Sequence, residues 1–224
     1  MFNSIKLIKV GCTALIAWFL LDLSLVGASE KNYKPSESRS QDRSESRRAG
    51  GARGGCNALL PTLDHTVILL VPQEPLASTL KSHPTFFWYV AEEVNLPLRF
   101  TLLELGEKPI IVKNISRPIS GINAFKLPTS IPPLKKGKTY RWTVTIVCSD
   151  LIPSKNLYAK AWLKRVSGIN ASEISEYAFG EVWYDELSTS YENGDRQTFN
   201  RLLEEVNLSE LNYNLKVNFI NVSQ

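Results

Sequence analysis

Acidic side chains are concentrated between residues 171 and 210, beside two aromatic residues. Glu181 and Asp185 are one helical turn apart there, with Trp183 and Tyr184 between them. Two carboxyl groups roughly 5 to 9 Å apart across a cleft can hydrolyse a glycosidic bond, with an aromatic ring as the sugar platform. Alternatively, a cation or a basic partner relieves the repulsion between neighbouring carboxylates. The plainest interpretation is a solvated acidic face with Trp183 packed on the rest of the domain.

Other residue types that perform chemistry are scarce. The two histidines, His65 and His83, have no Cys, Asp or Glu at metal-ligand spacing. The sequence contains no G-x-S-x-G, no phosphate-binding loop and no G-x-G-x-x-G that opens a helix. It therefore assigns no catalytic residue, predicts no metal or other cofactor, and favours a binding or structural protein over an enzyme.

The N-terminus has the three parts of a secretory signal peptide. A short basic stretch precedes an apolar run at residues 10–21, and small or compact residues follow at 26–28. The alternative is a retained membrane anchor, but the run is shorter than the roughly 18 to 20 residues that span a bilayer and ends at Asp22. We expect cleavage after Ala28 and no stable membrane anchor afterwards, so the protein is predicted to be periplasmic, in the cell envelope or extracellular.

Cleavage would remove Cys12 and leave two cysteines, Cys56 and Cys148. An even number of cysteines in an exported protein predicts that they form a disulfide. Such a bridge closes a loop of about 90 residues and contributes on the order of 4 kcal/mol to stability. The alternative is a pair of buried free thiols.

Residues 29–55 consist mostly of Ser, Arg, Glu and Gly. Such a segment has too little apolar surface to offset the entropy of ordering it, so we predict a disordered linker. Its arginines, Arg47, Arg48 and Arg53, offer an alternative role as a handle for an anionic polymer or a membrane surface.

From residue 56 to about 168 the sequence alternates between short apolar runs and turn residues, which is typical of an all-β domain. The seven predicted strands cover residues 65–71, 85–91, 97–105, 109–115, 121–127, 138–148 and 157–166. In the sixth, Tyr140, Trp142 and Val144 fall on one face and Arg141 and Thr143 on the other. Seven such strands predict two packed antiparallel sheets.

Two stretches of this domain resemble fibronectin type III domains. Residues 133–142 are similar to the turn and penultimate strand of that fold, in which a tyrosine hydroxyl, here that of Tyr140, bonds to nearby backbone. Residues 83–88 are similar to its second strand, with Trp88 in the core. The resemblance implies an immunoglobulin-like β-sandwich and is silent on activity.

Beyond residue 168 the apolar period changes from two to three or four. The spaced positions are Ile174, Tyr177, Gly180, Tyr184, Leu187 and Tyr191. Asn193 and Gly194 end this helical pattern, and Asp195 can cap a second helix at about 196–207. We therefore predict a helical hairpin and tail over residues 169–224, packed on the sandwich, whose stretch at 213–222 adds a strand or runs extended.

Four motifs occur in order, at residues 48–56, 84–90, 140–148 and 177–187. Together they resemble the domain-of-unknown-function family numbered 928, exported proteins found mainly in cyanobacteria. The last motif is close to G-x-W-Y-D-A-L, with Glu186 in place of the alanine. The resemblance covers about residues 48–211 and implies an exported location, a Cys56–Cys148 pair and the extent of the domain. It implies no activity and no catalytic residue.

The formal net charge of +4 is too small to predict a nucleic-acid partner. It divides into +7 over residues 56–170 and −8 over residues 171–210, so the two regions attract each other. The leading hypothesis is a non-enzymatic binding or structural module whose partner is an envelope protein or a polysaccharide. The alternative is a glycan hydrolase that uses Glu181 or Asp185.

Overall fold

The computed structural model describes residues 46–50, 56, 66–72, 76–90, 94, 96–167, 182–205, 208 and 216–221. The predicted signal peptide at 1–28 and most of the predicted linker lie outside these residues. The chain divides into two compact units, Met1–Glu30 and Lys31–Gln224, and every described residue belongs to the second. No helix within the described residues has the length and apolar character needed to cross a membrane.

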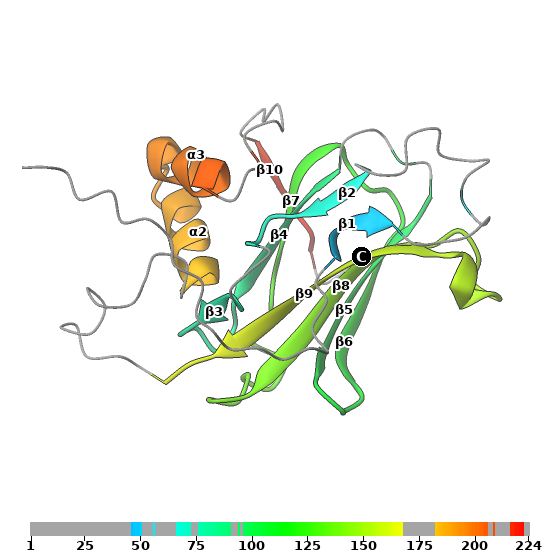
Figure 1. Ribbon diagram of the computed structural model, residues 1–224, viewed down its shortest axis with the longest axis horizontal. Helices are drawn as coiled ribbons and strands as arrows, with labels where there is room; N and C mark the ends of the chain where they lie inside the picture. The colour runs from blue at the N-terminus through cyan, green and yellow to red at the C-terminus, as the bar shows by residue number, and fades with distance from the viewer. Residues whose placement is uncertain are drawn as a thin grey trace, which may run out of the picture. The chain divides into compact units, whose positions relative to one another are not determined.

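The described part of the second unit is mainly β, with two sheets and two helices (Figure 1). One sheet contains, in order, β10 (Val217–Phe219), β7 (Gly121–Lys126), β4 (Thr85–Val90) and β2 (Val67–Leu69). The other contains β9 (Leu157–Arg165), β8 (Thr139–Ile146), β5 (Leu98–Glu104) and β6 (Pro109–Ile115). Strand β1 (Ser46–Gly50) pairs with both β2 and β9. Because β10 and β6 end the strand order, the sheets do not close into a barrel.

All seven predicted strands are present, with ends shifted by up to two residues. Strand β8 has the alternation that its sequence predicted: Tyr140, Trp142 and Val144 are buried, whereas Arg141 and Thr143 are only partly buried. Alternation predicts such strands well because one side of each faces the core and the other faces solvent. Strand β3 (Ser78–Thr79), which is parallel to β9, was not predicted. Strand β10, which is parallel to β7, lies in the stretch at 213–222 for which a strand was one of the two predicted alternatives.

The prediction of a disordered linker over residues 29–55 is wrong for Ser46–Gly50, which form β1. Arg48 lies opposite Ile68 of β2, while Gly50 lies opposite Tyr158 of β9. The prediction counted only apolar side chains. Strand β1 is instead held through antiparallel backbone pairing with a strand on each side, which composition does not reveal.

Aromatic side chains from both sheets meet in the core. The ring of Phe86 on β4 lies 5.1 Å from those of Phe100 on β5 and Trp142 on β8. Phe125 on β7 lies 4.8 Å from Phe100. All four side chains are fully buried, so apolar packing between the two sheets is the main source of their stability.

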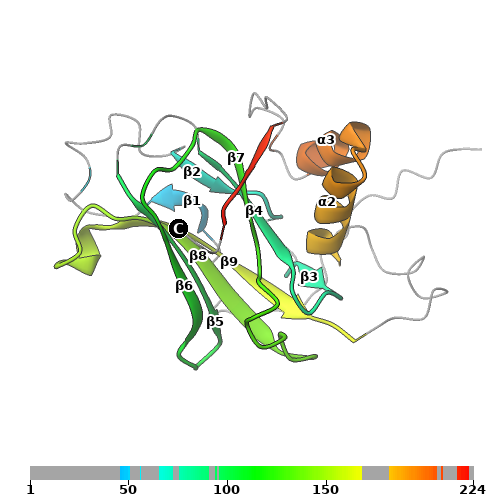
Figure 2. The ribbon, with the colours of Figure 1, turned by 180° about the vertical axis from the view of Figure 1, so that it is seen from behind.

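The helices are α2 (Trp183–Glu192) and α3 (Arg196–Glu205), joined at Asn193–Asp195. Gly194 adopts φ +69°, a conformation that favours glycine, and Asp195 Oδ1 accepts the Thr198 amide at 3.0 Å. Figures 1 and 2 show both helices on the side of the sheets where β3 and β4 lie. The positions predicted for helix between 168 and 181 lie outside the described residues.

Candidate functional site

The two aromatic residues of the acidic stretch anchor α2 and do not form a binding surface. Trp183 and Tyr184 are each 1% exposed. The Trp183 Nε1 group donates to the carbonyl oxygen of Leu70 at 2.9 Å. The Tyr184 hydroxyl accepts a hydrogen bond from Trp142 Nε1 at 2.7 Å and donates to the Trp162 carbonyl at 3.1 Å. The interpretation of these two side chains as a partner surface is therefore wrong, because both are buried against the strands.

The carboxylate of Asp185 also has a structural role. Its Oδ1 accepts the Thr79 hydroxyl at 2.5 Å, and its Oδ2 accepts the Leu80 amide at 2.6 Å. These bonds fasten the first turn of α2 to β3. Each oxygen thus accepts a hydrogen bond from the β3 region, which gives the carboxylate a structural role. The partner or cation surface predicted from Glu181, Trp183, Tyr184 and Asp185 is thus not assembled, and Glu181 lies outside the described residues.

The neighbouring Glu186 does have a shifted acidity. Burial raises the pKa of its carboxyl above the ordinary value, and the nearby Arg201 guanidinium opposes this shift. Glu205 and Asp185 contribute further negative charge that raises the pKa. Burial against a helix explains the shift without a ligand.

A cavity of about 400 Å³ lies where α2 meets α3. The described residues that line it are Ser190, Tyr191, Glu192, Gly194, Asp195, Arg196 and Phe199. The lining combines two aromatic rings, two carboxylates, a guanidinium group and a hydroxyl. The cavity is partly open to solvent, and its volume falls within the range of small-ligand sites.

The aromatic wall of this cavity continues onto the last strand. The Tyr191 ring lies 6.2 Å from that of Phe199 and 5.7 Å from that of Phe219 on β10, which is 45% exposed. Phe87 of β4 lies beneath, 6.2 Å from both Tyr191 and Phe199. An exposed ring beside a lined cavity gives a flat apolar face onto which a sugar or another ring can pack.

The charged groups of the cavity are fixed by neighbouring elements. Glu192 is ion-paired with Lys126 of β7 at 3.4 Å and with Lys81 at 3.9 Å. Hydrogen bonds from the Thr198 side chain and amide lower the pKa of Asp195 below its usual value, so Asp195 is ionised at neutral pH. Arg196 is exposed. The sequence did not predict this site, because its residues come together only where α3 turns away from α2 at Asn193–Asp195. The predicted helix break at this turn was the one feature of the sequence that pointed to it.

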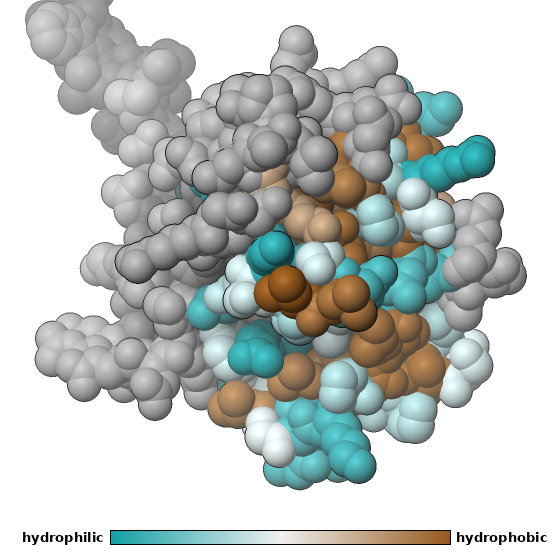
Figure 3. All heavy atoms as spheres, turned by 90° about the vertical axis from the view of Figure 1, so that its right-hand side faces the viewer, coloured by the Kyte–Doolittle hydropathy of each residue, from teal (hydrophilic) through white to brown (hydrophobic). Residues whose placement is uncertain are grey.

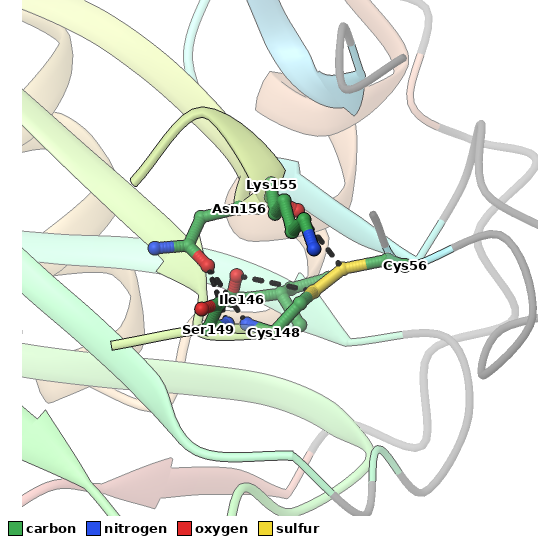
Figure 4. Close-up of a disulfide and its surroundings, with 6 residues drawn as sticks. All are labelled: Cys56, Ile146, Cys148, Ser149, Lys155 and Asn156. Carbon is green, nitrogen blue, oxygen red and sulfur yellow. Dashed lines mark hydrogen bonds between the residues drawn. A yellow bond between two sulfur atoms is a disulfide. The ribbon is translucent and has the colours of Figure 1, made fainter. Parts of the chain in front are cut away.

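The connection between β8 and β9 is tied to Cys56, near the start of the domain, by the predicted disulfide between Cys56 and Cys148. The Cα atoms of the two cysteines are 5.7 Å apart (Figure 4). Asn156 Oδ1 accepts the backbone amides of Cys148 and Ser149, both at 2.9 Å. The 3-10 turn η1 (Pro153–Lys155) lies within this loop. The bridge and the two bonds to Asn156 hold both ends of the loop together.

His83 plays no part in these sites. The His83 ring lies 3.0 Å from the Ser82 hydroxyl and 2.9 Å from the Ile131 carbonyl, both within hydrogen-bonding distance. His65 lies outside the described residues. No group of three or more His, Cys, Asp or Glu side chains that could hold a metal ion occurs in the described part of the chain.

No curated protein matches the sequence. A family model described as Domain of Unknown Function (DUF928) does match it, over residues 48–214, most of the second compact unit. That range takes in most of β1, strands β2 to β9, the disulfide and both helices with their cavity, and it ends before β10. The chain therefore belongs to the DUF928 family.

Proposed function

We propose that this protein is a non-enzymatic binding module that holds part of a polysaccharide in the cavity between α2 and α3. The lining of that cavity carries the proposal. Tyr191, which is partly exposed, offers a ring face for the apolar face of a sugar, with the buried Phe199 ring behind it. Glu192, Asp195 and Arg196 offer acceptors and donors for the sugar's hydroxyl groups. The other occupant that fits a cavity of this size is a side chain of an envelope protein.

The proposed scaffold is an immunoglobulin-like sandwich with a C-terminal helical hairpin. Its support is the strand order, because β2-β4-β7 and β9-β8-β5-β6 would correspond to the two sheets of a fibronectin type III domain. Tyr140 adds support: its hydroxyl accepts the Lys135 amide at 2.6 Å and lies 3.4 Å from the Lys135 carbonyl. A tyrosine that bonds to the backbone a few residues upstream marks the corner of such sandwiches.

The proposed location is the periplasm, the cell envelope or the extracellular space. The signal-peptide pattern at residues 1–28 supports export, and so does the Cys56–Cys148 bridge, since disulfides persist mainly in oxidising compartments. In cyanobacteria, where the family resemblance places the protein, the polysaccharide would be an envelope or exported glycan. N-terminal sequencing of the protein from its own cell envelope tests this, with Ser29 expected as the first residue.

The alternative of a glycan hydrolase that uses Glu181 and Asp185 is not favoured. Such a mechanism needs a free carboxyl group beside the scissile bond. Both oxygens of Asp185 are hydrogen-bonded to β3 and the residue after it, so the group would have to break contacts that hold α2. Hydrolysis of an envelope glycan that is abolished by Asp185→Asn, in a variant that still melts cooperatively, would restore this alternative.

Co-sedimentation of the purified protein with insoluble envelope polysaccharide tests the proposed binding. Arg196→Ala removes a charged group of the cavity and should weaken binding by about tenfold, the effect of losing one charged hydrogen bond. Arg201→Ala is the matched control, because Arg201 lies on the same helix but is paired with Glu205 and does not line the cavity. Equal binding by both variants and the unchanged protein would overturn the assignment of the cavity.

A further inference from the structure

The loop between β8 and β9 presents apolar side chains to solvent at its tip. Leu151 is 92% exposed and Ile152 is 44% exposed. A single exposed apolar side chain is ordinary on a protein surface. Two in succession at the most protruding part of a loop require more explanation, because nothing within the described residues covers Leu151.

This tip is held in place by hydrogen bonds. The Ile152 amide donates to the Ser149 hydroxyl at 3.1 Å, and the Lys155 amide donates to the Ile152 carbonyl at 3.0 Å. At the base of the loop lie the Cys56–Cys148 bridge and the buried Asn156 that caps two backbone amides (Figure 4). A loop that is already held by such bonds loses little conformational entropy when its tip is immobilised by binding.

A second loop leaves the same end of the sheet. Leu98 at the start of β5 pairs with Ile115 at the end of β6 and with Ile146 at the end of β8. The β6–β7 loop therefore begins beside the β8–β9 loop, and it carries Ile119, which is 53% exposed. Figure 3 views this side of the molecule and shows apolar side chains, in brown, gathered at the centre with hydrophilic ones, in teal, around them.

Among the described residues, the charged side chains around this end are mostly positive. Lys155 beside the tip and Arg117 beside Ile119 are both exposed. Asp150, the acidic residue next to the tip, is already paired with Arg99 at 3.0 Å. Glu92 and Glu93 of the β4–β5 connection lie outside the described residues. At the opposite end of the sheet, the exposed Leu105 follows Glu104, which is ion-paired with Lys135 and Lys138, and its turn also contains Glu107 and Lys108.

We infer that this end of the domain docks on the surface of an anionic lipid bilayer, with Leu151 and Ile152 inserted among the acyl chains and Lys155 and Arg117 at the headgroups. A bilayer accepts a protruding apolar tip without a matching pocket, and anionic headgroups attract the flanking cations. The inference does not depend on the proposed glycan site, which lies at the α2–α3 junction.

Insertion of the loop tip into a bilayer can be tested with a fluorophore whose emission increases in a hydrocarbon environment. The fluorophore is attached to Leu151→Cys in one protein and to Leu105→Cys in another, both with Cys12→Ser and with the native disulfide kept oxidised. Vesicles of equal parts phosphatidylglycerol and phosphatidylcholine should shift the emission of the label at position 151 to the blue and leave that at 105 unchanged. Pure phosphatidylcholine or 1 M NaCl should weaken the response, since the headgroup attraction is then absent or screened.

Replacing both tip residues, Leu151→Asp with Ile152→Asp, should lower the vesicle partition coefficient by about tenfold or more, whereas Leu105→Asp should not change it. Because the label reports its own surroundings, attachment through the apolar run at residues 10–21 cannot imitate the result. Equal responses at positions 151 and 105, or no response at 151 on anionic vesicles, would overturn the inference. Protection of position 151 by an envelope protein in the absence of lipid would instead identify a protein partner, which also overturns it.

Discussion

A single oxygen atom connects α2 to two neighbouring strands, β8 and β9, and its removal by Tyr184→Phe is the most informative perturbation. The Tyr184 hydroxyl accepts from Trp142 Nε1 and donates to the Trp162 carbonyl, and Trp142 is fully buried. Phenylalanine keeps the ring and its packing 5.8 Å from Phe86. The substitution leaves a buried indole donor without this partner, which costs about 1–3 kcal/mol.

We expect the free energy of unfolding to fall by about 2 kcal/mol, measured by denaturant titration of the oxidised protein. For a domain of this size, that loss lowers Tm by about 4 to 8 °C. The midpoint should move without a change in the denaturant slope, because the same surface is exposed on unfolding. Tyr158→Phe is the matched control, because Tyr158 lies on β9 and is 44% exposed. This substitution should change the free energy of unfolding by no more than about 0.5 kcal/mol.

The reasoning fails if Tyr184→Phe is as stable as the Tyr158→Phe control. That result would mean that α2 is not anchored in the core through this hydroxyl. A separate melting transition for the helices in the unchanged protein would contradict the account in a second way, because one continuous core of buried side chains includes Trp183, Leu187 and Phe199 together with the strands.

Three further predictions concern the same elements. Asp185→Ala should cost about 1.5–3 kcal/mol in denaturant unfolding, because the Leu80 amide loses a charged acceptor; a loss below 0.5 kcal/mol, the usual range for surface changes, would contradict the anchoring role. Reduction of the Cys56–Cys148 bridge should lower stability by on the order of 4 kcal/mol, and thiol titration of the unreduced, denatured protein should find neither cysteine free. Burial raises the pKa of Glu186 in the folded state. At pH values between the ordinary pKa and this raised pKa, the folded state therefore binds more protons than the unfolded state. The contribution of Glu186 thus makes stability fall as pH rises through this range. Glu186→Gln should therefore be more stable than the unchanged protein at pH 7 and equally stable below pH 4, and identical pH profiles would refute this.

The β strands could be predicted because their signal is local. In β8 the side chains alternate between buried and half-buried, and the pattern is visible in the sequence of that strand alone. The start of α3 was also local, since Asp195 and Thr198 are three residues apart and form the cap themselves. By contrast, β1 is held by two strands distant in the chain, and composition alone argued against it.

The candidate site could not be predicted in the same way. Asp185 looked like a free acid because its partners, Thr79 and Leu80, are more than 100 residues away in the sequence. For Trp183 the plainest interpretation of the sequence, packing on the rest of the domain, agrees with its burial. Its partner, the Leu70 carbonyl, could not be read from the sequence, because it is 113 residues away. The cavity itself exists only once α2 and α3 have packed together, because its lining residues lie between Ser190 and Phe199.

Two-dimensional NMR of the isotopically labelled protein, titrated with oligosaccharides released from its own envelope polysaccharide, tests the central claim most directly. The same spectra follow both the protein amides and the sugar signals, so they report where the ligand binds and whether it is consumed. We predict saturable shifts centred on residues 191–199, which include most of the cavity lining, and on Phe219 beside Tyr191, with the oligosaccharide intact at the end of the titration. Shifts confined to other parts of the chain, or cleavage of the oligosaccharide, would contradict a glycan-binding module built on the α2–α3 junction.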